Sequence, residues 1–501
     1  PGTSFEGRLS SEVRASWGGA NGGNFVQAAL VADTFSLANA WPQNDVVQTD
    51  QVRAACEVAW QADRINIQKA TIDCDLANLS AIGTIPLKQQ EGVTLAALLQ
   101  QRQRISGRLD LARLARLLPN TLRLRRNMQI NSGAMQLALS SEPQPKGTIW
   151  RGQLQSSNLA GVANGRQITW QQPILAVIEA HDTANGPLVD SLRCESYFLK
   201  LQGQGTLDNL TASATFSLQQ LADRLGQFAD RRDLKFAGEG NGRLNWRRTP
   251  QGQLDGGAEM QLTGFQCAMA GREPWREESL LAFVSAKGQT DFTTETRIDS
   301  ATLNVKAGSD KIEAQLTQPV ANLRGGGIWP LYLKMEGQLQ NWPARLAFLL
   351  PTNKCRLAGA YAFDADVMAS KDTGNLKRVR FAAAPLTVAS PWLTLNEPRI
   401  DLEAGGSWDW RARKLQIEPA KLNCPSLALQ ANNILVALPE AGPMELAGNV
   451  KYQGEIGRLR QWFLGAAPPA WQMAGQLTGE AQLQQTGNTI RGTTVADIAN
   501  L

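Results

Sequence analysis

The sequence predicts a mainly β protein, built as an elongated, curled antiparallel sheet with a few short amphipathic helices between β-meander units. Three observations predict it. Apolar and polar residues alternate with a period of two along much of the chain, glycine- and proline-rich turns separate the alternating runs, and an Ala-Gly pair that opens such a run recurs after short helical stretches. The absence of a regular alternation of strand and helix argues against a Rossmann or barrel fold.

The Ala-Gly pair is the clearest sign of internal repetition. Its glycines, Gly238, Gly359 and Gly475, are 121 and 116 residues apart, and a weaker copy is centred on Gly133. A near-fixed period indicates like units added side by side with a long shared surface, rather than a pocket folded around one reaction.

A short amphipathic stretch precedes each copy, at residues 110–119, 217–225, 342–351 and 457–464. Apolar residues spaced by three or four give each stretch one apolar stripe, which predicts a helix. Asp110 and Ser217 are the expected N-caps, and Pro119 and Pro351 the expected stop signals. The repeating unit is therefore expected to be strand, short helix, return strand and meander.

These repeats divide the chain into a series of expected units, which together form one continuous elongated domain. The boundaries are a partial β unit at 1–106, helix-plus-meander units at 107–213, 214–337 and 338–454, and the start of a further unit at 455–501. Because the chain begins inside a strand-like run, we expect it to be an internal piece of a larger protein.

Individual strands are predicted where alternation is strict, at 65–67, 72–76, 135–139, 303–307, 312–316 and 415–417. Turn signals fall at 185–187, 249–252, 307–310 and 441–443. Four short helices are too few to cover a sheet of about 30 strands. The uncovered apolar face either stays available, as a place for acyl chains, or closes into β-sandwich-like cores, and the alternation allows both.

Composition narrows the function classes. Apolar residues are ample along all 501 residues, which excludes disorder, and the net charge of +5 favours no particular partner. The six scattered cysteines contain no Cys-x-x-Cys pair, so free thiols are favoured over zinc or a disulfide framework. No apolar run is long enough to span a membrane.

Catalytic machinery is not evident. The single histidine, His181, is expected in an exposed loop, and no nucleophile, phosphate or dinucleotide motif accompanies it. Paired acids such as Glu277 with Glu278, or Asp364 with Asp366, fit a solvated strand face better than glycosidic chemistry. We therefore expect no enzyme activity, no cofactor and no metal.

Two residue types leave alternatives open. The recurring tryptophans suit core packing, and they also suit the rim of a lipid-contacting surface. Clusters of arginines could contact phosphates of lipid or nucleic acid, but no nucleic-acid recognition motif lies beside them. These clusters are Arg123, Arg125 and Arg126, then Arg231 and Arg232, then Arg247 and Arg248.

Two segments carry a family resemblance: 106–119, reading Ser-Gly-Arg-Leu-Asp-Leu-Ala-Arg-Leu-Ala-Arg-Leu-Leu-Pro, and the run from Trp342 to the Leu357-Ala358-Gly359 return strand. This combination resembles the AsmA-like superfamily of bacterial envelope proteins, which includes the TamB and YhdP groups. The many Trp and Cys residues, and the lack of an N-terminal membrane anchor, depart from that pattern.

The resemblance implies a repeating β-groove in the periplasm or cell envelope, anchored to the membrane by a segment outside this chain. It implies a non-enzymatic role in phospholipid transport or outer-membrane assembly, with phospholipid and envelope proteins as partners and no nucleic acid. A structural or adhesive β-repeat scaffold with closed cores is the alternative.

No functional residue is transferred from the family, so the candidate groove residues come from strand alternation alone. They are Met135, Leu137, Leu139, Leu244, Trp246, Tyr361, Phe363, Leu415, Ile417, Leu477 and Leu483.

Overall fold

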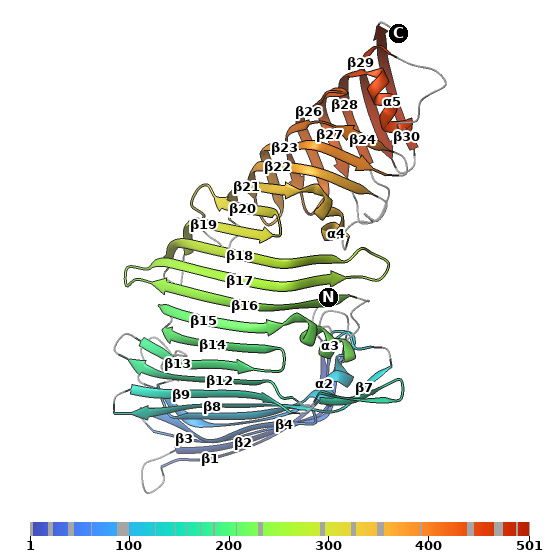
Figure 1. The fold of residues 1–501 in the computed structure, drawn as a ribbon. Coiled ribbons are helices and arrows are strands. Elements are labelled where there is room, and N and C mark those ends of the chain that lie inside the picture. Colours follow the sequence, from blue (N-terminus) through green and yellow to red (C-terminus); the bar gives the residue numbers. More distant parts are fainter. Residues whose placement is uncertain are drawn as a thin grey trace. The chain divides into compact units, whose positions relative to one another are not determined.

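The computed structural model describes residues 4–18, 24–38, 45–61, 63–87, 100–125, 127–145, 147–157, 159–170, 172–183, 186–206, 208–228, 234–290, 296–321, 327–347, 355–390, 393–437, 445–464, 474–486 and 489–499. The fold is mainly β, with 75% strand and 8% helix, and contains a large curled antiparallel sheet (Figure 1). The chain divides into two compact units, unit 1 (Pro1–Asn245) and unit 2 (Trp246–Leu501). The predicted fold class is thus confirmed.

Unit 1 contains one long run of antiparallel strands, in which every strand pairs with the next in the order given. They are β1 (Ser4–Ser16), β2 (Asn24–Ala38), β3 (Val47–Trp60), β4 (Arg64–Cys74), β5 (Ala77–Pro86), β6 (Gln103–Asp110), β8 (Ala134–Gln144), β9 (Gly147–Ser156), β12 (Leu175–Thr183), β13 (Gly186–Glu195), β14 (Leu199–Thr206) and β15 (Asn209–Ser217).

A small second sheet lies in the same unit. Its strands are β7 (Met128–Ser132), β10 (Leu159–Ala163) and β11 (Arg166–Trp170), with β10 in the middle. Helices α2 (Leu111–Leu117) and α3 (Leu218–Phe228) belong to this unit, and residues of both join a core with the small sheet. The strand β16 (Lys235–Arg248) contains the boundary between the two units.

Unit 2 repeats the long antiparallel run, with β24 (Thr394–Glu397) added beside β23. Its strands are β17 (Gln253–Ala268), β18 (Trp275–Thr290), β19 (Thr296–Ala307), β20 (Asp310–Leu316), β21 (Trp329–Gln338), β22 (Arg356–Ala369), β23 (Thr373–Ala389), β25 (Ile400–Asp409), β26 (Lys414–Cys424), β27 (Leu427–Ala437), β28 (Glu445–Glu455), β29 (Gln476–Thr486) and β30 (Thr489–Ala499). Its helices are η2 (Leu339–Asn341), α4 (Trp342–Leu346) and α5 (Ile456–Leu464).

The predicted helices occur where the sequence places them. The Asp110 carboxylate caps α2 by accepting a hydrogen bond from the Arg113 N–H at 2.8 Å, and the Ser217 hydroxyl accepts one from the Gln220 N–H at 3.3 Å. Helix α2 ends before Pro119, as expected. Pro351 lies outside the described residues.

Each repeat is a strand, a helix and a return strand that pairs with the incoming one. Asp110 lies opposite Ala134 across α2, and Glu455 lies opposite Gln476 across α5. The glycines that open the return strands all have φ between +131° and +141°; they are Gly133, Gly238, Gly359 and Gly475. At Gly359 a Cβ atom would also overlap the carbonyl oxygen of Pro385. This backbone conformation explains why glycine recurs.

Candidate functional site

The predicted residues Met135, Leu137 and Leu139 lie on one face of β8. Residues directly opposite one another on neighbouring strands point to the same side of a sheet, so the pairing register shows which side chains share this face. Leu139 lies opposite Ile105 of β6 and Gly152 of β9, which gives it an apolar or small neighbour on each side.

Following that register outward gives two continuous rows across unit 1 in which nearly every residue is apolar or glycine. The Leu139 row, from β1 to β15, consists of Val13, Ala28, Cys56, Ala70, Ala81, Ile105, Leu139, Gly152, Ile178, Leu192, Gly203 and Ala212. The Leu137 row consists of Ser11, Leu30, Ala54, Ile72, Leu79, Gly107, Leu137, Leu154, Ala176, Cys194, Leu201 and Ala214.

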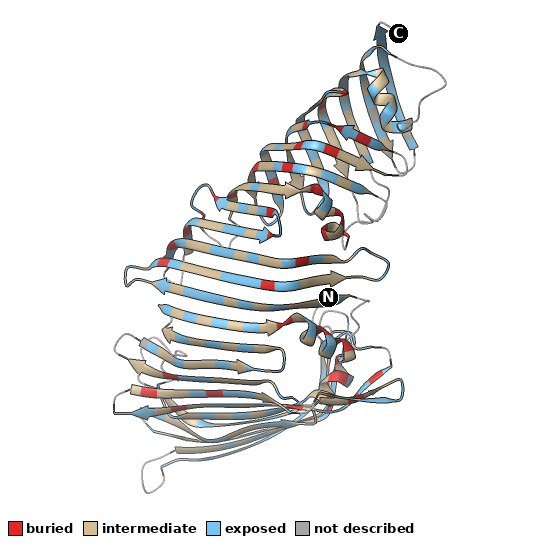
Figure 2. Ribbon diagram, in the orientation of Figure 1, coloured by how far each residue is buried: buried red, intermediate tan, exposed pale blue. Residues whose placement is uncertain are grey.

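Large side chains in these unit 1 rows are accessible to solvent. Exposed fractions are 66% for Val13, 48% for Ile72 and 40% for Leu139. Most strand positions of the molecule are likewise intermediate or exposed rather than buried (Figure 2). A contiguous apolar surface that is left open in this way is typical of a binding site for apolar ligands or partners.

Unit 2 contains two equivalent rows. The Phe363 row, from β17 to β30, consists of Met260, Ala282, Val305, Ile312, Met335, Phe363, Phe381, Leu402, Leu422, Leu429, Tyr452, Gly479 and Ala496. The Ala365 row consists of Ala258, Val284, Leu303, Ala314, Leu333, Ala365, Val379, Ala404, Ala420, Ala431, Val450, Ala481 and Thr494.

Exposure varies along these unit 2 rows. Val284 on β18 is 43% exposed, whereas Ala365 on β22 is 1% exposed. Next to Phe363 on the same face, Tyr361 is buried in a core formed with Leu339, Ala383, Leu386, Leu395 and Ile400. Trp342 of α4 and Trp462 of α5 pack against that core, so both helices contribute to covering this part of the face.

The opposite face of the unit 2 sheet is a ladder of alternating charges. From β20 to β29 its directly opposed residues are Glu313, Lys334, Asp364, Arg380, Glu403, Lys421, Gln430, Lys451 and Glu480. Asp364 pairs with Arg380 at 3.1 Å and Asp366 with Arg378 at 3.2 Å, all partly exposed. These aspartates therefore take part in a solvated, charged face.

The other predicted groove residues are placed in several settings. Leu244 on β16 is exposed, whereas Trp246 packs against a core of Leu254, Ile298, Leu316 and Val320. Leu415 and Ile417 on β26 are half-buried. Leu137, Leu139 and Phe363 lie in the apolar rows, and Tyr361 lies in a protein core. Met135 lies outside the two rows, opposite Leu109 of β6 and Ser156 of β9.

The last two predicted residues lie on β29. Leu477 is half-buried and lies opposite Gly454 and Ile498. The backbone of Leu483 pairs with Gly448, but its side chain lies outside what the structure describes.

A buried ion cluster fastens α4 to the unit 2 sheet. The Arg345 guanidinium lies 2.7 Å from Glu277 Oε1 and 3.0 Å from Asp310 Oδ2, and it donates to the Ala307 carbonyl at 3.1 Å. All three charged groups are buried. Burial opposes the charge on Arg345, but the two carboxylates outweigh it and raise the pKa of the guanidinium. The prediction that Glu277 lies on a solvated strand face is therefore wrong, because its partner Arg345 is 68 residues away and no local pattern indicates the pairing.

Helix α5 is fastened through a buried carboxylate without a cation among the described residues. Glu397 Oε1 on β24 accepts hydrogen bonds from the Trp462 indole N–H at 3.0 Å and from the Ser426 hydroxyl. Glu397 is buried together with Ser426. Neutral hydrogen-bond donors thus hold α5 against the sheet, whereas the charged Arg345 holds α4.

His181 lies within strand β12 and not in a loop, which corrects that expectation: the alternation that precedes it continues through Thr183. Its Nδ1 lies 2.8 Å from Asp190 Oδ2, and its side chain is 40% exposed. Within the described ranges no cluster of His, Cys, Asp or Glu could hold a metal ion.

All six cysteines are free, as the sequence predicted, and they are half-buried. Burial raises the pKa of the Cys267 thiol, and it raises that of Cys424, where the carboxylate of Glu397 adds to the effect. A raised thiol pKa lowers the fraction of nucleophilic thiolate at neutral pH, which fits a packing role for these two residues.

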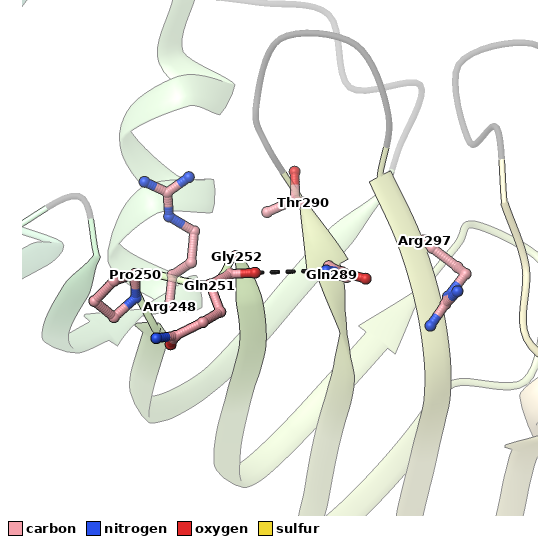
Figure 3. A pocket seen from close by; sticks show the side chains of 7 residues that line it. All are labelled: Arg248, Pro250, Gln251, Gly252, Gln289, Thr290 and Arg297. Atoms are coloured by element: carbon pink, nitrogen blue, oxygen red, sulfur yellow. Dashed lines mark hydrogen bonds between the residues drawn. The ribbon is translucent and has the colours of Figure 1, made fainter.

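A polar recess lies at the strand ends of unit 2, beside the turn between β16 and β17 (Figure 3). Its lining includes Arg248, Gln289, Thr290 and Arg297, with no carboxylate among the described lining residues. Arg297 is paired with Asp299 at 2.7 Å, and the Thr290 N–H donates to the Gly252 carbonyl at 2.9 Å. These pairings satisfy polar groups at the strand ends, so the recess suggests no chemistry of its own.

The fold and the rows define a class: a mainly β protein in which the long strand run of each unit carries an apolar face, opposite a charged face in unit 2. Comparison of the chain with protein-family models, with curated proteins and with solved structures yields no match. No helix in the described ranges is long and apolar enough to cross a membrane.

Proposed function

We propose that this protein binds acyl-chain lipid along the apolar rows, as a non-enzymatic lipid-binding or lipid-conduit segment of the bacterial cell envelope. The observation that carries the proposal is the pair of unit 1 rows, which run without interruption from β1 to β15 and leave large apolar side chains exposed. The resemblance to AsmA-like proteins supports the same role in phospholipid transport or outer-membrane assembly.

The chemistry of these rows fits a chain-like apolar ligand. They offer aliphatic side chains and glycines, with no charged side chain in either row. At Gly152 a Cβ atom would meet Ile178 Cγ2 at 2.7 Å and Leu139 Cδ2 at 3.0 Å, so these two side chains lean over the glycine. A surface of this kind binds through apolar area, at about 0.8 kcal/mol per buried CH₂ group.

A structural β-repeat scaffold is the second candidate, and the covered part of unit 2 favours it. There Tyr361 lies in a protein core, so protein rather than lipid fills the face. The two functions make different predictions for the open unit 1 rows. Lipid binding predicts acyl chains on these rows, and the scaffold function predicts none.

Photo-crosslinking in cells tests the proposal. A photoreactive amino acid replaces Leu139 on the apolar face, and the matched control replaces Ser140, which lies on the opposite face between Arg104 and Arg151. We expect phospholipid adducts at position 139 and none at 140. Positions 363 and 417 extend the test to unit 2.

Protein-only adducts at position 139, or equal lipid capture at 139 and 140, would contradict lipid binding and favour the scaffold. Mass spectrometry of lipids bound to the purified chain gives an independent reading of the same question.

A further inference from the structure

A second recess lies in unit 1, and none of its described lining residues belongs to the apolar rows. Three separate segments line it: Arg125 after α2, the hairpin from Ala163 to Thr169, and Arg224 with Gln227 of α3. Among the described residues that line it are Arg125, Arg166 and Arg224, and none of these described lining residues is Asp or Glu.

These three cations have no ion-pair partner among the residues that the structure describes. Three like charges lining one recess repel one another, and an anion placed among them relieves that repulsion. Each guanidinium also presents several N–H donors in a planar fork that matches the oxygens of phosphate or carboxylate.

The positions of the arginines are fixed by contacts of the surrounding chain. The Arg125 N–H donates to the carbonyl of Phe228 at 3.2 Å, which holds the end of α3 beside this segment. The Arg224 guanidinium lies 5.1 Å from the ring centroid of Tyr197, a cation–π contact that restricts its side chain. Phe228 itself is buried in the core that α2 shares with the small sheet.

The hairpin that carries Arg166 is equally well defined. Asn164 and Gly165 have φ values of 50° and 75°, which is the geometry of a two-residue turn that joins β10 to β11. The Asn164 side-chain oxygen accepts a hydrogen bond from Asn127 Nδ2 at 2.9 Å. The turn therefore presents Arg166 on a fixed element rather than on a free loop.

We propose that this arginine recess binds a phosphate group, supplied either by a lipid headgroup or by a small phosphate-containing solute. The shared chemistry is a tetrahedral oxyanion held by guanidinium donors, with the polar side chains of Gln167, Thr169 and Gln227 beside it. The site does not depend on acyl-chain binding along the rows, because its ligand is the anion.

Calorimetric titration of the full chain separates the two sources. One arm uses inorganic phosphate, and the other uses short-chain phosphatidylglycerol below its micelle concentration. Tighter binding of the phosphatidylglycerol, by about tenfold or more, assigns the site to a lipid headgroup, and similar affinities assign it to free phosphate groups. Loss of affinity with rising salt is expected in both arms.

Variants locate the site. The double variant Arg166→Gln/Arg224→Gln should weaken binding about tenfold or more, while Arg193→Gln, an exposed arginine on β13, should change it by less than about twofold. The single variant Arg166→Gln, at the exposed first residue of β11, keeps the test valid if the double variant loses its fold. The proposal is overturned if neither probe binds the wild-type chain, or if Arg193→Gln weakens binding as much as the recess variants.

Discussion

The two units contain the same repeat, but their helices pack in different places. In unit 1, residues of α2 and α3 form a core with the small sheet of β7, β10 and β11. In unit 2, Trp342 of α4 and Trp462 of α5 pack against the core around Tyr361, on the apolar face of the long sheet. The unit 1 rows consequently keep large side chains exposed, whereas part of the unit 2 face is buried.

This difference shows that the surface on which a helix packs, and not the strand pattern, decides whether an apolar face is covered. The strands of both units alternate in the same way and form equally continuous rows. In unit 2 the covering helices are fastened by buried carboxylates, Glu277 and Asp310 at α4 and Glu397 at α5. Breaking these fastenings should make the covered face of unit 2 resemble the open face of unit 1.

The largest effect is expected for Arg345→Met. It leaves Glu277 and Asp310 buried without a cation, which should cost about 3–5 kcal/mol of the free energy of unfolding of unit 2. Urea unfolding measures the loss, and hydrogen exchange of the backbone amides of β22 and β24 localises it.

The matched control is Arg378→Met, which removes a cation from Asp366 on the exposed polar face. An exposed pair of this kind contributes about 0–1 kcal/mol. Equal losses in the two variants would show that the Arg345 cluster is not what fastens α4.

A comparison of two leucine truncations tests the difference between the faces directly. Leu395→Ala removes a side chain from the covered core and should cost about 2–5 kcal/mol. Leu139→Ala removes a side chain that is 40% exposed in the open rows and should cost about 1 kcal/mol or less. Urea unfolding of both variants gives the difference, and a cost for Leu139→Ala as large as that for Leu395→Ala would mean that the unit 1 face is closed in solution.

The sequence predicted what depends on local patterns. The four helices, the caps at Asp110 and Ser217, and the strand around Leu139 follow from residue spacing and hydrogen-bonding chemistry. The return-strand glycines were found as a repeat, and their positive φ supplies the reason.

What depends on contacts distant in sequence could not be predicted. Arg345 and Glu277 are 68 residues apart, and no local pattern indicates that they pair. Tyr361 and Phe363 follow the same alternation, yet one is buried and the other only partly so, because Leu339 and Trp342 pack against the core around Tyr361. His181 was placed in a loop because its neighbours Asp182 and Asn185 favour turns, but cross-strand pairing extends β12 through Thr183.

A smaller effect is expected for Trp462→Phe at the second fastening. The variant keeps most of the aromatic packing of α5 but removes the indole N–H that donates to Glu397, which should cost about 1–3 kcal/mol. Trp408→Phe is the control, since that buried indole nitrogen has no hydrogen-bond partner in the described part of the chain, so the variant loses ring area but no hydrogen bond. If thermal unfolding shifts equally in both variants, packing and not the hydrogen bond holds α5.

The smallest effect is expected for the acid sensitivity of unit 1. There the Asp45 carboxylate accepts hydrogen bonds from neutral donors in the residues that follow α2. Asp45 accepts hydrogen bonds from the Thr121 N–H at 2.6 Å and from the Asn120 side chain at 2.9 Å. Burial acts to raise the pKa of Asp45, but these hydrogen bonds outweigh it and hold that pKa below its ordinary value.

A lowered folded-state pKa stabilises the fold above the ordinary aspartate pKa of about 3.9, and that contribution disappears as the pH falls through the lower, folded-state value. The free-energy difference between the wild-type chain and Asp45→Asn, measured by urea unfolding, should therefore be constant above about pH 5 and shrink below about pH 4. A difference that stays constant down to pH 2 would show that the charge on Asp45 contributes nothing to unit 1. Loss of this free-energy difference in acid would instead show that the charged Asp45 carboxylate, held by neutral donors, stabilises unit 1. Unit 2 differs, because an ion cluster stabilises α4 there.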